Sequence, residues 1–591
     1  LDREGIRLKT EEWEPAVQKV YIELDMPTLS DVKADFQRIE SAVGSSLIAP
    51  IDVMRSIPSV IRAARGKVTA VLWWDGLNPS GSPELLALEP GDTSRYFYAA
   101  AIDIGTTTIA GYLWNLADRT KVAVHSCSNP QAAFGADVLS RLTYAAQNEG
   151  GDVRLQEAVL RGIDEVLQEL AGKAGVPVQN IYEIVLVGNT CMQHLFFRFD
   201  TRQLGLSPYI PAYQRLLSFP LKEISDHRRT IRDEGLNRGD MPQPHYTGEL
   251  ARPAQPDEYV SKADHLAPRE QQAIAAQPDN FIRGGNAPCT FLPVIAGFVG
   301  ADTVGCILAT GMDRREDVTL MIDLGTNAEM VIGSKERLIA CSAAAGPAFE
   351  GARIERGMRA TPGAIDGVWF KERYAYHVIG GERPIGICGS GLVDVIAMLA
   401  EYGIIDEKGL IRDNPHAPEE LRRRVRPQDR MSYEQARAKS QGVESETAKS
   451  QVGPFAFVLA RADETGDGRD LVLTQKDIRE VQLAKGAISC GIRILMKELG
   501  VTPGDISKIF LAGAFGNYID PRSAQRIAIL PAEIPLDRVV PVGNAAGVGA
   551  QMALISKAAR RRADEIASRV EHLELALHPD FLEGFTRGMY F

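Results

Sequence analysis

The sequence lacks the features that mark several broad classes of protein. Its seven cysteines lie far apart, with no CxxC pair and no close cluster, which excludes a local zinc or iron–sulfur site of recognised spacing. Basic residues number 66 against 77 acidic ones, for a net charge of −11. That balance argues against a nucleic-acid binder or an anionic-membrane binder. The most apolar stretch, 291–310, contains Pro293 and Asp302, so it predicts a buried helix and no membrane span.

The composition instead favours a large, folded, multidomain protein. Apolar residues make up 45% of the 591 positions, which is enough for several cores. No secretory signal is visible, and scattered, odd-numbered cysteines are typical of a reducing compartment. We therefore expect a cytoplasmic protein that binds neither nucleic acid nor membrane.

The chain divides into a short entry segment, a small domain and a long α/β region. Residues 1–17 are expected to be a linker, and residues 18–97 a small α+β domain. The elements of this domain are expected at 19–24 and 67–74 as strands, and at 51–64 and from a cap at Ser30 as helices. Residues 98–591 have α/β character, with polar insertions at 221–288 and 411–453 that are expected at the surface.

An internal duplication is the strongest signal in the sequence. GVPVQNIYEIVLVG (175–188) aligns without a gap with GVTPGDISKIFLAG (500–513), at a constant offset of 325 residues. Each copy follows an amphipathic helix, expected at about 153–171 and 475–499. Each copy therefore predicts a helix, a glycine-ended turn and a buried strand that ends in glycine.

A second pair of related segments lies upstream of each copy. AIDIGTTT (101–108) and MIDLGTNA (321–328) both bring an Asp to the end of an apolar strand, just before a Gly-Thr turn. Such a turn exposes backbone N–H groups and hydroxyls that suit phosphate oxygens. Asp103 and Asp323 would then face the same phosphates, with a Mg²⁺ held mostly through waters. The sequence predicts a two-lobed α/β fold with a cleft between the lobes.

These segments carry a family resemblance. The two turns resemble the phosphate motifs of the actin-like ATPase and sugar-kinase superfamily, which has a ribonuclease H-like fold, and IFLAGAFGNYI (509–519) resembles its adenosine motif. Other segments resemble the ATP-dependent reductive activators of corrinoid proteins. They are PAVQKVYIELDMPTLSD (15–31), NPQAAFGADVLSRL (129–142), AAGPAFEGARIERG (344–357), GICGSGLVDVIAML (386–399), TQKDIREVQLAKGAI (474–488) and LAGAFGNYIDP (511–521).

The resemblance implies a specific activity. Such activators use ATP and Mg²⁺ to drive reduction of an inactive Co(II) corrinoid to Co(I) in methyltransferase systems, with a corrinoid protein and a reduced electron donor as partners. It also implies an N-terminal [2Fe-2S] domain, which needs a C-x₄-C-x₂-C set that this sequence does not contain. We therefore expect the chain to start just after the cluster domain. A homodimer is compatible with the resemblance.

The resemblance also assigns residues to the site. The first phosphate loop comprises Asp103, Gly105, Thr106, Thr107 and Thr108, and the second Asp323, Gly325, Thr326 and Asn327. Gly513, Ala514, Phe515 and Gly516 would approach the adenosine, and Gly389, Ser390 and Gly391 would line the same pocket. Asp103 and Asp323 are expected to hold the metal and act in catalysis. Asp137 and Gln131 are expected to orient water or metal, although Asp137 can equally be a helix cap.

Other readings stay open at this point. A small-molecule kinase of the same fold is the main alternative function, and a polymerising nucleotide-dependent scaffold is a third. Asn189 and His194 are expected to be structural. The basic run 422–424 is expected to be a solvated face, with a docking patch as the alternative. One of Arg353, Arg356 and Arg359 could face phosphate.

Overall fold

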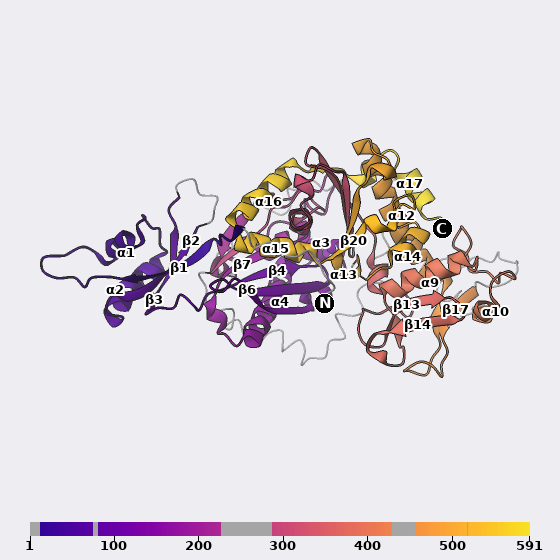
Figure 1. Cartoon of the computed structure of the whole chain (residues 1–591), viewed down its shortest axis with the longest axis horizontal. Coiled ribbons are helices and arrows are strands. Elements are labelled where there is room, and N and C mark those ends of the chain that lie inside the picture. The colour runs from indigo at the N-terminus through magenta and orange to yellow at the C-terminus, as the bar shows by residue number, and fades with distance from the viewer. Residues whose placement is uncertain (1–11, 75–80, 226–286, 428–454, 517) are drawn as a thin grey trace.

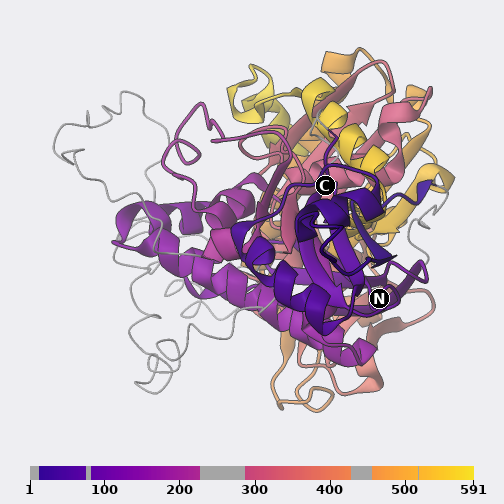
Figure 2. The same cartoon turned by 90° about the vertical axis from the view of Figure 1, so that its left-hand side faces the viewer.

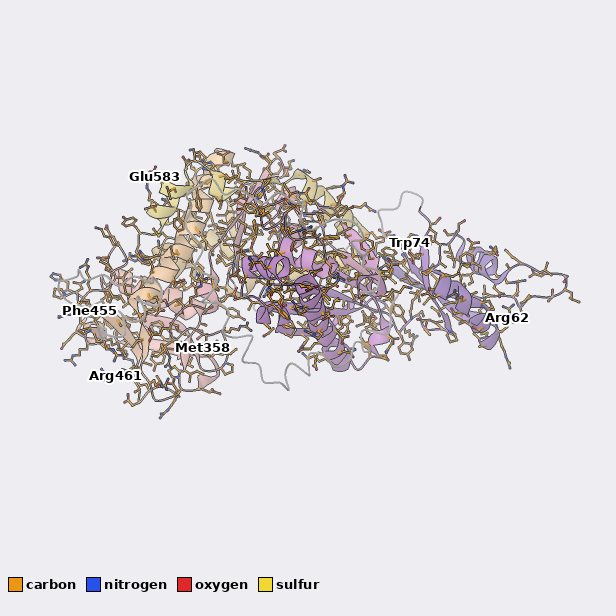
Figure 3. All side chains as sticks on the ribbon, turned by 180° about the vertical axis from the view of Figure 1, so that it is seen from behind. Arg62, Trp74, Met358, Phe455, Arg461 and Glu583 are labelled. Carbon is orange, nitrogen blue, oxygen red and sulfur yellow. The ribbon has the colours of Figure 1, made fainter. Side chains whose placement is uncertain are left out.

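The computed structural model describes residues 12–74, 81–225, 287–427, 455–516 and 518–591. Figure 1 shows three units in a row: a small domain, a first lobe and a second lobe. Figure 2 looks along the row from the side of the small domain. Figure 3 shows from behind that Arg62 lies toward the outer end of the small domain, Trp74 lies nearer the middle of the molecule, and Phe455 and Arg461 lie toward the opposite end, in the second lobe.

The small domain is a three-stranded antiparallel sheet with two helices. Strands β1 (Val17–Glu23), β2 (Lys67–Trp73) and β3 (Glu84–Pro90) pair in the order β1-β2-β3. Helices α1 (Asp35–Val43) and α2 (Ile51–Ala63) bury Ile39, Ile57 and Ile61 against the sheet. Both strands and the helix expected at 51–64 are confirmed, and α2 tolerates Pro58 within it.

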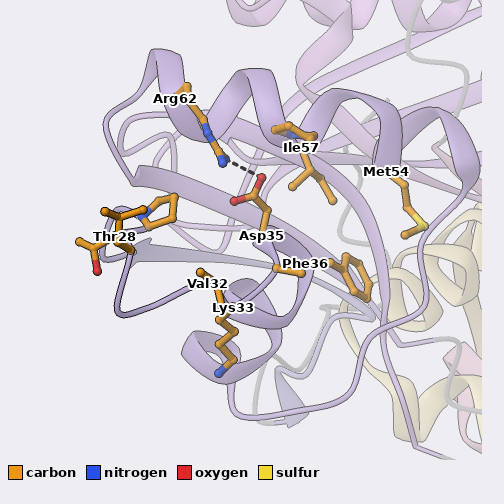
Figure 4. Close-up of a pocket in the computed structure, with 12 residues that line it drawn as sticks. Thr28, Val32, Lys33, Asp35, Phe36, Met54, Ile57 and Arg62 are labelled. Atoms are coloured by element: carbon orange, nitrogen blue, oxygen red, sulfur yellow. Dashed lines mark hydrogen bonds and ion pairs between the residues drawn. The ribbon is translucent and has the colours of Figure 1, made fainter.

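The helix expected from Ser30 was placed too early. Helix α1 begins at Asp35 after an N-cap at Ala34, because residues 28–31 form a turn in which Thr28 and Asp31 exchange backbone hydrogen bonds. The segment leading to the helix leaves Leu29 and Val32 exposed beside a shallow groove between α1 and α2. Figure 4 shows Phe36, Met54 and Ile57 on the wall of this groove, and the 2.5 Å ion pair of Arg62 with Asp35 across it.

The first lobe is built on a six-stranded sheet in the order β6-β5-β4-β7-β9-β8. The strands are β4 (Tyr98–Ile104), β5 (Thr108–Asn115), β6 (Thr120–Ser128), β7 (Ile181–Gly188), β8 (Leu217–Pro220) and β9 (Pro288–Phe291). Helix α4 (Gly151–Ala174) covers one face, while α8 (Ala301–Thr310) and α15 (Ala545–Ile555) lie against the other. The stretch 291–310 is thus only half helical, because Pro293 lies in a loop that separates β9 from α8.

The second lobe repeats this plan. Its sheet has the order β20-β19-β10-β11-β12-β21. The strands are β10 (Thr319–Leu324), β11 (Ala328–Gly333), β12 (Leu338–Ala343), β19 (Lys508–Ala512), β20 (Val539–Gly543) and β21 (Glu571–His572). Helix α12 (Gln475–Leu499) packs on β11 and β12. One continuous core joins the first sheet, α8, α15 and α16 (Lys557–Arg569) to one face of the second sheet.

Strand register confirms the duplication. In the first lobe the β4–β5 hairpin lies beside the parallel strand β7, and Asp103 is opposite Val187. In the second lobe the β10–β11 hairpin lies beside the parallel strand β19, and Asp323 is opposite Ala512. Val187 and Ala512 are equivalent at the offset of 325 residues found in the sequence. The two aspartates therefore occupy the same position in both lobes.

The second lobe is larger because it carries an added subdomain. It contains the sheets β14-β13-β15 and β16-β17-β18, and helices α9 (Gly389–Glu401) and α10 (Glu419–Arg422). The strands are β13 (Ala364–Phe370), β14 (Tyr374–Val378), β15 (Gly386–Ile387), β16 (Val425–Pro427), β17 (Phe455–Ala460) and β18 (Leu471–Leu473). The structure describes residues 411–427 of the insertion expected at 411–453. Most of these residues are exposed or half-buried, while Ile411, Ala417 and Leu421 pack into the core of the second lobe. The expected surface insertion stays a prediction.

The expected linker and the two expected insertions are described only in part. Residues 1–11 of the expected linker, 226–286 of the first insertion and 428–454 around the second lie outside the described residues. Among the residues that are described, no helix has the length and apolar character needed to cross a membrane.

Buried polar contacts fix the small domain to the first lobe. Lys19 Nζ donates to Glu89 Oε2 at 2.7 Å and to the hydroxyl of Tyr182 at 2.8 Å, and Tyr182 donates to Glu89 Oε1 at 2.6 Å. Nearby, the Trp73 indole donates to Glu183, which forms a fully buried ion pair with Arg560 on α16. Separating the two units would expose these partners, so they are expected to move together.

Candidate nucleotide site

Each lobe presents a tight Gly-Thr turn at the end of its hairpin. Gly105 N donates to the carbonyl of Thr108, and Gly325 N donates to that of Asn327, both at 3.0 Å. A Cβ atom at Gly105 would lie 2.7 Å from the Thr108 carbonyl oxygen, so a side chain there would force the turn open. Both expected phosphate loops are therefore compact turns. Contact of these turns with phosphate stays a prediction.

The structure brings the two expected aspartates together at the lobe junction. Asp103 Oδ2 accepts a 2.8 Å hydrogen bond from Asn544 Nδ2, and Asp323 Oδ2 accepts one from Cys306 Sγ at 3.5 Å. Burial raises the pKa of Asp103 to about 7, and the carboxylate of Asp323 adds to the shift. Burial also raises the pKa of Asp323. Asp302, at the start of α8, has a pKa raised to about 7 by burial and then by Asp323.

These carboxyl groups fit a site for a hydrated cation. Asp103, Asp302 and Asp323 are partly buried. The carboxylate of Asp323 raises the pKa of both Asp103 and Asp302, and no lysine or arginine is among the causes of the shifts of the three groups. Across the described ranges, no three Asp, Glu, His or Cys side chains form a ready-made coordination sphere. A Mg²⁺ bound by one or two carboxylates, waters and phosphate oxygens needs no such sphere. The donor set therefore suits a Mg²⁺ that arrives with a nucleotide.

Glu350 connects the two phosphate loops. Its carboxylate accepts hydrogen bonds from the hydroxyls of Thr107 in the first loop and Thr326 in the second, both at 2.6 Å. Sequence reasoning did not single it out as a site residue, although it lies within the segment AAGPAFEGARIERG that carried part of the resemblance. Its contact with Thr107 spans 243 residues of sequence, which no local pattern could reveal.

Residues behind the first loop hold it in place. Arg141, fully buried on α3 (Val138–Gln147), donates to the Thr106 carbonyl at 2.5 Å and to Gln131 Oε1 at 3.2 Å. Burial lowers its pKa to about 10. The Gln131 amide donates in turn to the Leu155 carbonyl at 2.9 Å. The side chain of Gln131 is thus engaged inside the lobe. Its expected role in orienting water or metal stays a prediction.

Asp137 occupies the alternative position that its sequence allowed. Its Oδ1 accepts a 2.8 Å hydrogen bond from Ser140 N, in a capping box at the start of α3. This bond satisfies an N–H group that would otherwise lack a partner. A role for Asp137 in orienting water stays a prediction.

The adenosine motif follows β19 directly. Gly513 has φ +87°, and a Cβ atom there would lie 2.6 Å from Asp323 Oδ1 and 2.7 Å from the Leu324 carbonyl oxygen. Only glycine lets this turn approach the second phosphate loop. Ala514 and Gly516 belong to the same short helix, α13 (Gly513–Gly516). The ring of Phe515 stacks on Phe349, with centroids 4.9 Å apart.

Gly389, Ser390 and Gly391 begin α9 close to this motif. A Cβ atom at Gly389 would lie 2.0 Å from the Phe349 carbonyl oxygen, and one at Gly391 would lie 2.4 Å from that of Ile365. The Ser390 hydroxyl donates to the Asp366 carbonyl at 2.8 Å. These residues therefore bring the start of α9 against Phe349 and β13. Contact of all three with nucleotide stays a prediction.

The two residues expected to be structural, Asn189 and His194, both make hydrogen bonds within the protein. Asn189 donates to Thr106 Oγ1 at 3.0 Å and caps α5 (Thr190–Phe197) by accepting from Met192 N. His194 is buried and bonded through both ring nitrogens, to the Thr190 carbonyl and to Ala212 N. Burial lowers its pKa. All seven cysteines are free thiols, and six of them are buried.

Five of the six arginines that sequence left open contact protein groups. Arg422 pairs with Asp413, Arg423 pairs with Glu419, and Arg424 lies over the ring of Tyr374. A docking patch at 422–424 gains no support from this arrangement. Arg356 pairs with Asp467, and Arg359 donates across the lobe junction to Ser128 Oγ at 2.9 Å.

The duplicated sheets and paired loops define a two-lobed, actin-like protein of the ASKHA class, preceded by a small α+β domain. Family models confirm this. The RACo linker region matches residues 7–95, the RACo middle region matches 98–230, and the C-terminal domain of RACo, the ASKHA domain, matches 317–444 and 428–591. The region expected as a middle domain thus carries the description of a linker region.

Individual relatives agree with the models. The corrinoid activation enzyme RamQ of Eubacterium limosum is 33% identical over 514 residues, which are 87% of this chain and 73% of that protein. A [Co(II) methylated amine-specific corrinoid protein] reductase of Methanosarcina barkeri is 28% identical over 329 residues, covering 50% of this chain and 52% of its own. A solved reductive activator for corrinoid, iron-sulfur protein superposes with a TM-score of 0.77 at 30% identity, over 99% of this chain and 80% of that one. The chain belongs to the RACo family of corrinoid-activating proteins.

Proposed function

We propose that this protein is an ATP-hydrolysing activator of a corrinoid protein. ATP binding and hydrolysis at the lobe junction are coupled to reduction of an inactive Co(II) corrinoid to Co(I) in a methyl-transfer system. The observation that carries the proposal is the matched register of Asp103 and Asp323, each followed by a Gly-Thr turn and both turns joined by Glu350. Family membership supplies the partner class.

The residues take distinct roles in this proposal. Backbone N–H groups and hydroxyls of the two turns bind phosphate oxygens. Asp103 and Asp323 would hold Mg²⁺ through waters, and the ion would neutralise phosphate charge. Asn544 orients the Asp103 carboxylate through its 2.8 Å hydrogen bond. Phe515 and the start of α9 offer the surface for the adenosine.

The electron comes from a carrier outside the residues of this sequence, which is in turn filled by a reduced donor. The seven cysteines of this chain form no C-x₄-C-x₂-C set, so the proposal assigns the one-electron step to a carrier other than these residues. This protein contributes the ATP-dependent step: closure of the lobes on nucleotide and reopening after hydrolysis. That cycle acts on the corrinoid partner so that Co(II) accepts the electron.

The proposal is tested by steady-state phosphate release from Mg-ATP, with and without a Co(II) corrinoid protein. We expect the partner to stimulate release, and both Asp103→Ala and Asp323→Ala to abolish it. Asp118→Asn is the matched control, because Asp118 lies at the far end of β5 and pairs with Asn115. It should behave as wild type.

Two results would contradict the proposal. One is phosphate release that ignores the corrinoid protein and persists in both aspartate variants. The other is ADP formation only when a small hydroxylated metabolite is added, with a phosphorylated product. That second result would support a kinase of the same fold.

A further inference from the structure

A single short turn contacts all three nucleotide motifs. The 3₁₀ turn Pro347–Glu350 follows β12 in the second lobe. Its last residue, Glu350, accepts hydrogen bonds from Thr107 of the first loop and Thr326 of the second. Its neighbour Phe349 stacks on Phe515 of the adenosine motif. A change at Glu350 would therefore alter contacts in both phosphate loops and next to the adenosine motif.

The two threonine hydroxyls can serve only one acceptor each. A hydroxyl has one proton to donate, and at 2.6 Å both protons are directed to the Glu350 carboxylate. The oxygens of a bound terminal phosphate are also acceptors. A phosphate placed between the loops must take these protons, or it would face hydroxyl lone pairs and a nearby carboxylate of the same charge. Glu350 and such a phosphate compete for the same two donors.

We propose that Glu350 sets the preference of the site for nucleotides with and without a terminal phosphate. In the ligand-free protein the Glu350 carboxylate accepts from both threonine hydroxyls and so bridges the two loops. The γ-phosphate of ATP takes over the two hydroxyls and releases Glu350, whereas ADP leaves Glu350 in place. This inference rests on the proposed function, since it assumes that the loops bind ATP.

The release of Glu350 has a route to the rest of the protein. The chain that continues from Glu350 is tied to α12 by a 2.9 Å bond from Glu355 N to Asp477 Oδ1. It then makes a second contact between the lobes, from Arg359 to Ser128 Oγ. Glu350 and Arg359 thus hold two points of the lobe junction on one segment. Loss of the first contact leaves the Arg359–Ser128 contact between that segment and the first lobe.

The test compares affinities for two nucleotides in a variant that keeps the shape of the side chain. Glu350→Gln removes the charge but retains one acceptor oxygen. Charge-assisted hydrogen bonds are about twice as strong as neutral ones, so the competition should weaken. By calorimetry, we expect the affinity for the ATP analogue Mg-AMP-PNP to rise about tenfold relative to that for Mg-ADP.

Three controls sharpen this test. Glu355 belongs to the same segment, but it lines a separate groove together with Arg356 and Arg426. Glu355→Gln should therefore leave the ratio of the two affinities unchanged. Glu350→Ala should shift the ratio in the same direction as Glu350→Gln, so that failure of one variant to fold still leaves a test. In a Thr107→Val, Thr326→Val background, Glu350→Gln should have no further effect on the ratio.

The outcomes separate this inference from the function on which it rests. If Glu350→Gln weakens both nucleotides equally, Glu350 is structural and the inference fails. If both affinities are unchanged while phosphate release falls, Glu350 acts on the reacting water, and the inference fails again. If the wild-type protein binds neither nucleotide, the proposed function fails together with it. If the wild-type protein binds both nucleotides and Glu350→Gln has the same ratio of affinities as wild type, only the inference is overturned.

Discussion

The two copies of the repeat end in different chemistry on the same backbone plan. In the first lobe, β7 ends at Gly188 and the chain continues into Asn189. The side-chain amide of Asn189 donates to Thr106 Oγ1, and its oxygen accepts from the start of α5. In the second lobe, β19 leads into Gly513, which approaches within contact of Asp323 and opens into the adenosine motif. The hairpins kept an aspartate in both lobes, whereas the strand ends diverged. One copy supports the first expected phosphate loop, and the other leads into the expected adenosine motif.

The largest effect on phosphate release is expected from a substitution at Gly513, where the second copy leads into the adenosine motif. Gly513→Ala puts a Cβ atom 2.6 Å from Asp323 Oδ1 at a backbone φ of +87°. We expect phosphate release to fall by about 100-fold, because the carboxylate and the turn must move apart. Steady-state kinetics with Mg-ATP checks this.

The equivalent change in the first lobe should act differently. A Cβ atom at Gly188 would lie 2.7 Å from the Ile104 carbonyl oxygen, so Gly188→Ala should lower the melting temperature. Rates measured on the protein that remains folded should stay within a few-fold of wild type. A similar loss of rate in both variants would show that the two strand ends are not functionally distinct.

A second prediction concerns the helices that precede the strands. At the offset of 325 residues, buried Lys485 on α12 takes the place of buried Leu160 on α4. Lys485 Nζ donates to the carbonyl oxygens of Gly588, at 2.8 Å, and Tyr590, at the end of α17 (Phe581–Gly588). Burial lowers the pKa of Lys485 to about 7, and the positive charge of Arg493 contributes.

The sign of the pH effect follows from that lowered pKa. Below pH 7 Lys485 is charged in the folded and unfolded states, and the cost of burying the charge is fully present. As the pH rises from about 7 toward 10.5, the unfolded chain keeps a proton that the folded chain has lost, so stability rises. Between pH 7 and pH 9, unfolding by denaturant should show wild type gaining about 2 kcal/mol relative to Lys485→Met. A pH-independent difference between the two would contradict the shift.

The smallest expected effect tests the supporting role of Asn189. Asn189→Ala removes the cap of α5 and the bond to Thr106. We expect a loss of about 1 kcal/mol in unfolding free energy, with phosphate release reduced less than threefold. Asn189→Asp keeps a capping oxygen and should restore most of the stability. A large loss of rate at unchanged stability would instead place Asn189 in the nucleotide site.

Local and repeated features were predictable, and long-range contacts were not. The two hairpins and the glycine-ended strands follow from short patterns that occur twice, so each copy supports the other. Glu350, Asn544 and Arg141 escaped prediction because their partners lie 243, 441 and 35 residues away. Their residue types are common at caps and on surfaces, so sequence position alone does not distinguish them.

Two positions, Ser30 and Gln131, lie in a different setting from the one predicted for them. The start expected at Ser30 failed because a reciprocal turn between Thr28 and Asp31 competes with the helix. The resemblance suggested that Gln131 orients water or metal. In the structure its amide donates to the buried Leu155 carbonyl, and its Oε1 accepts from Arg141. A buried polar group demands a partner, and buried Gln131 finds its partners within the protein.

The central claim is that the two lobes form one catalytic unit, with one aspartate from each. The most direct measurement is phosphate release from Mg-ATP by Asp103→Asn, Asp323→Asn and the double variant, in protein shown to be folded. The account predicts that either single change lowers the rate by about 100-fold or more and that the double change costs little beyond the worse single one, because residues that act as a unit are not additive. A single variant that keeps the wild-type rate would contradict the account.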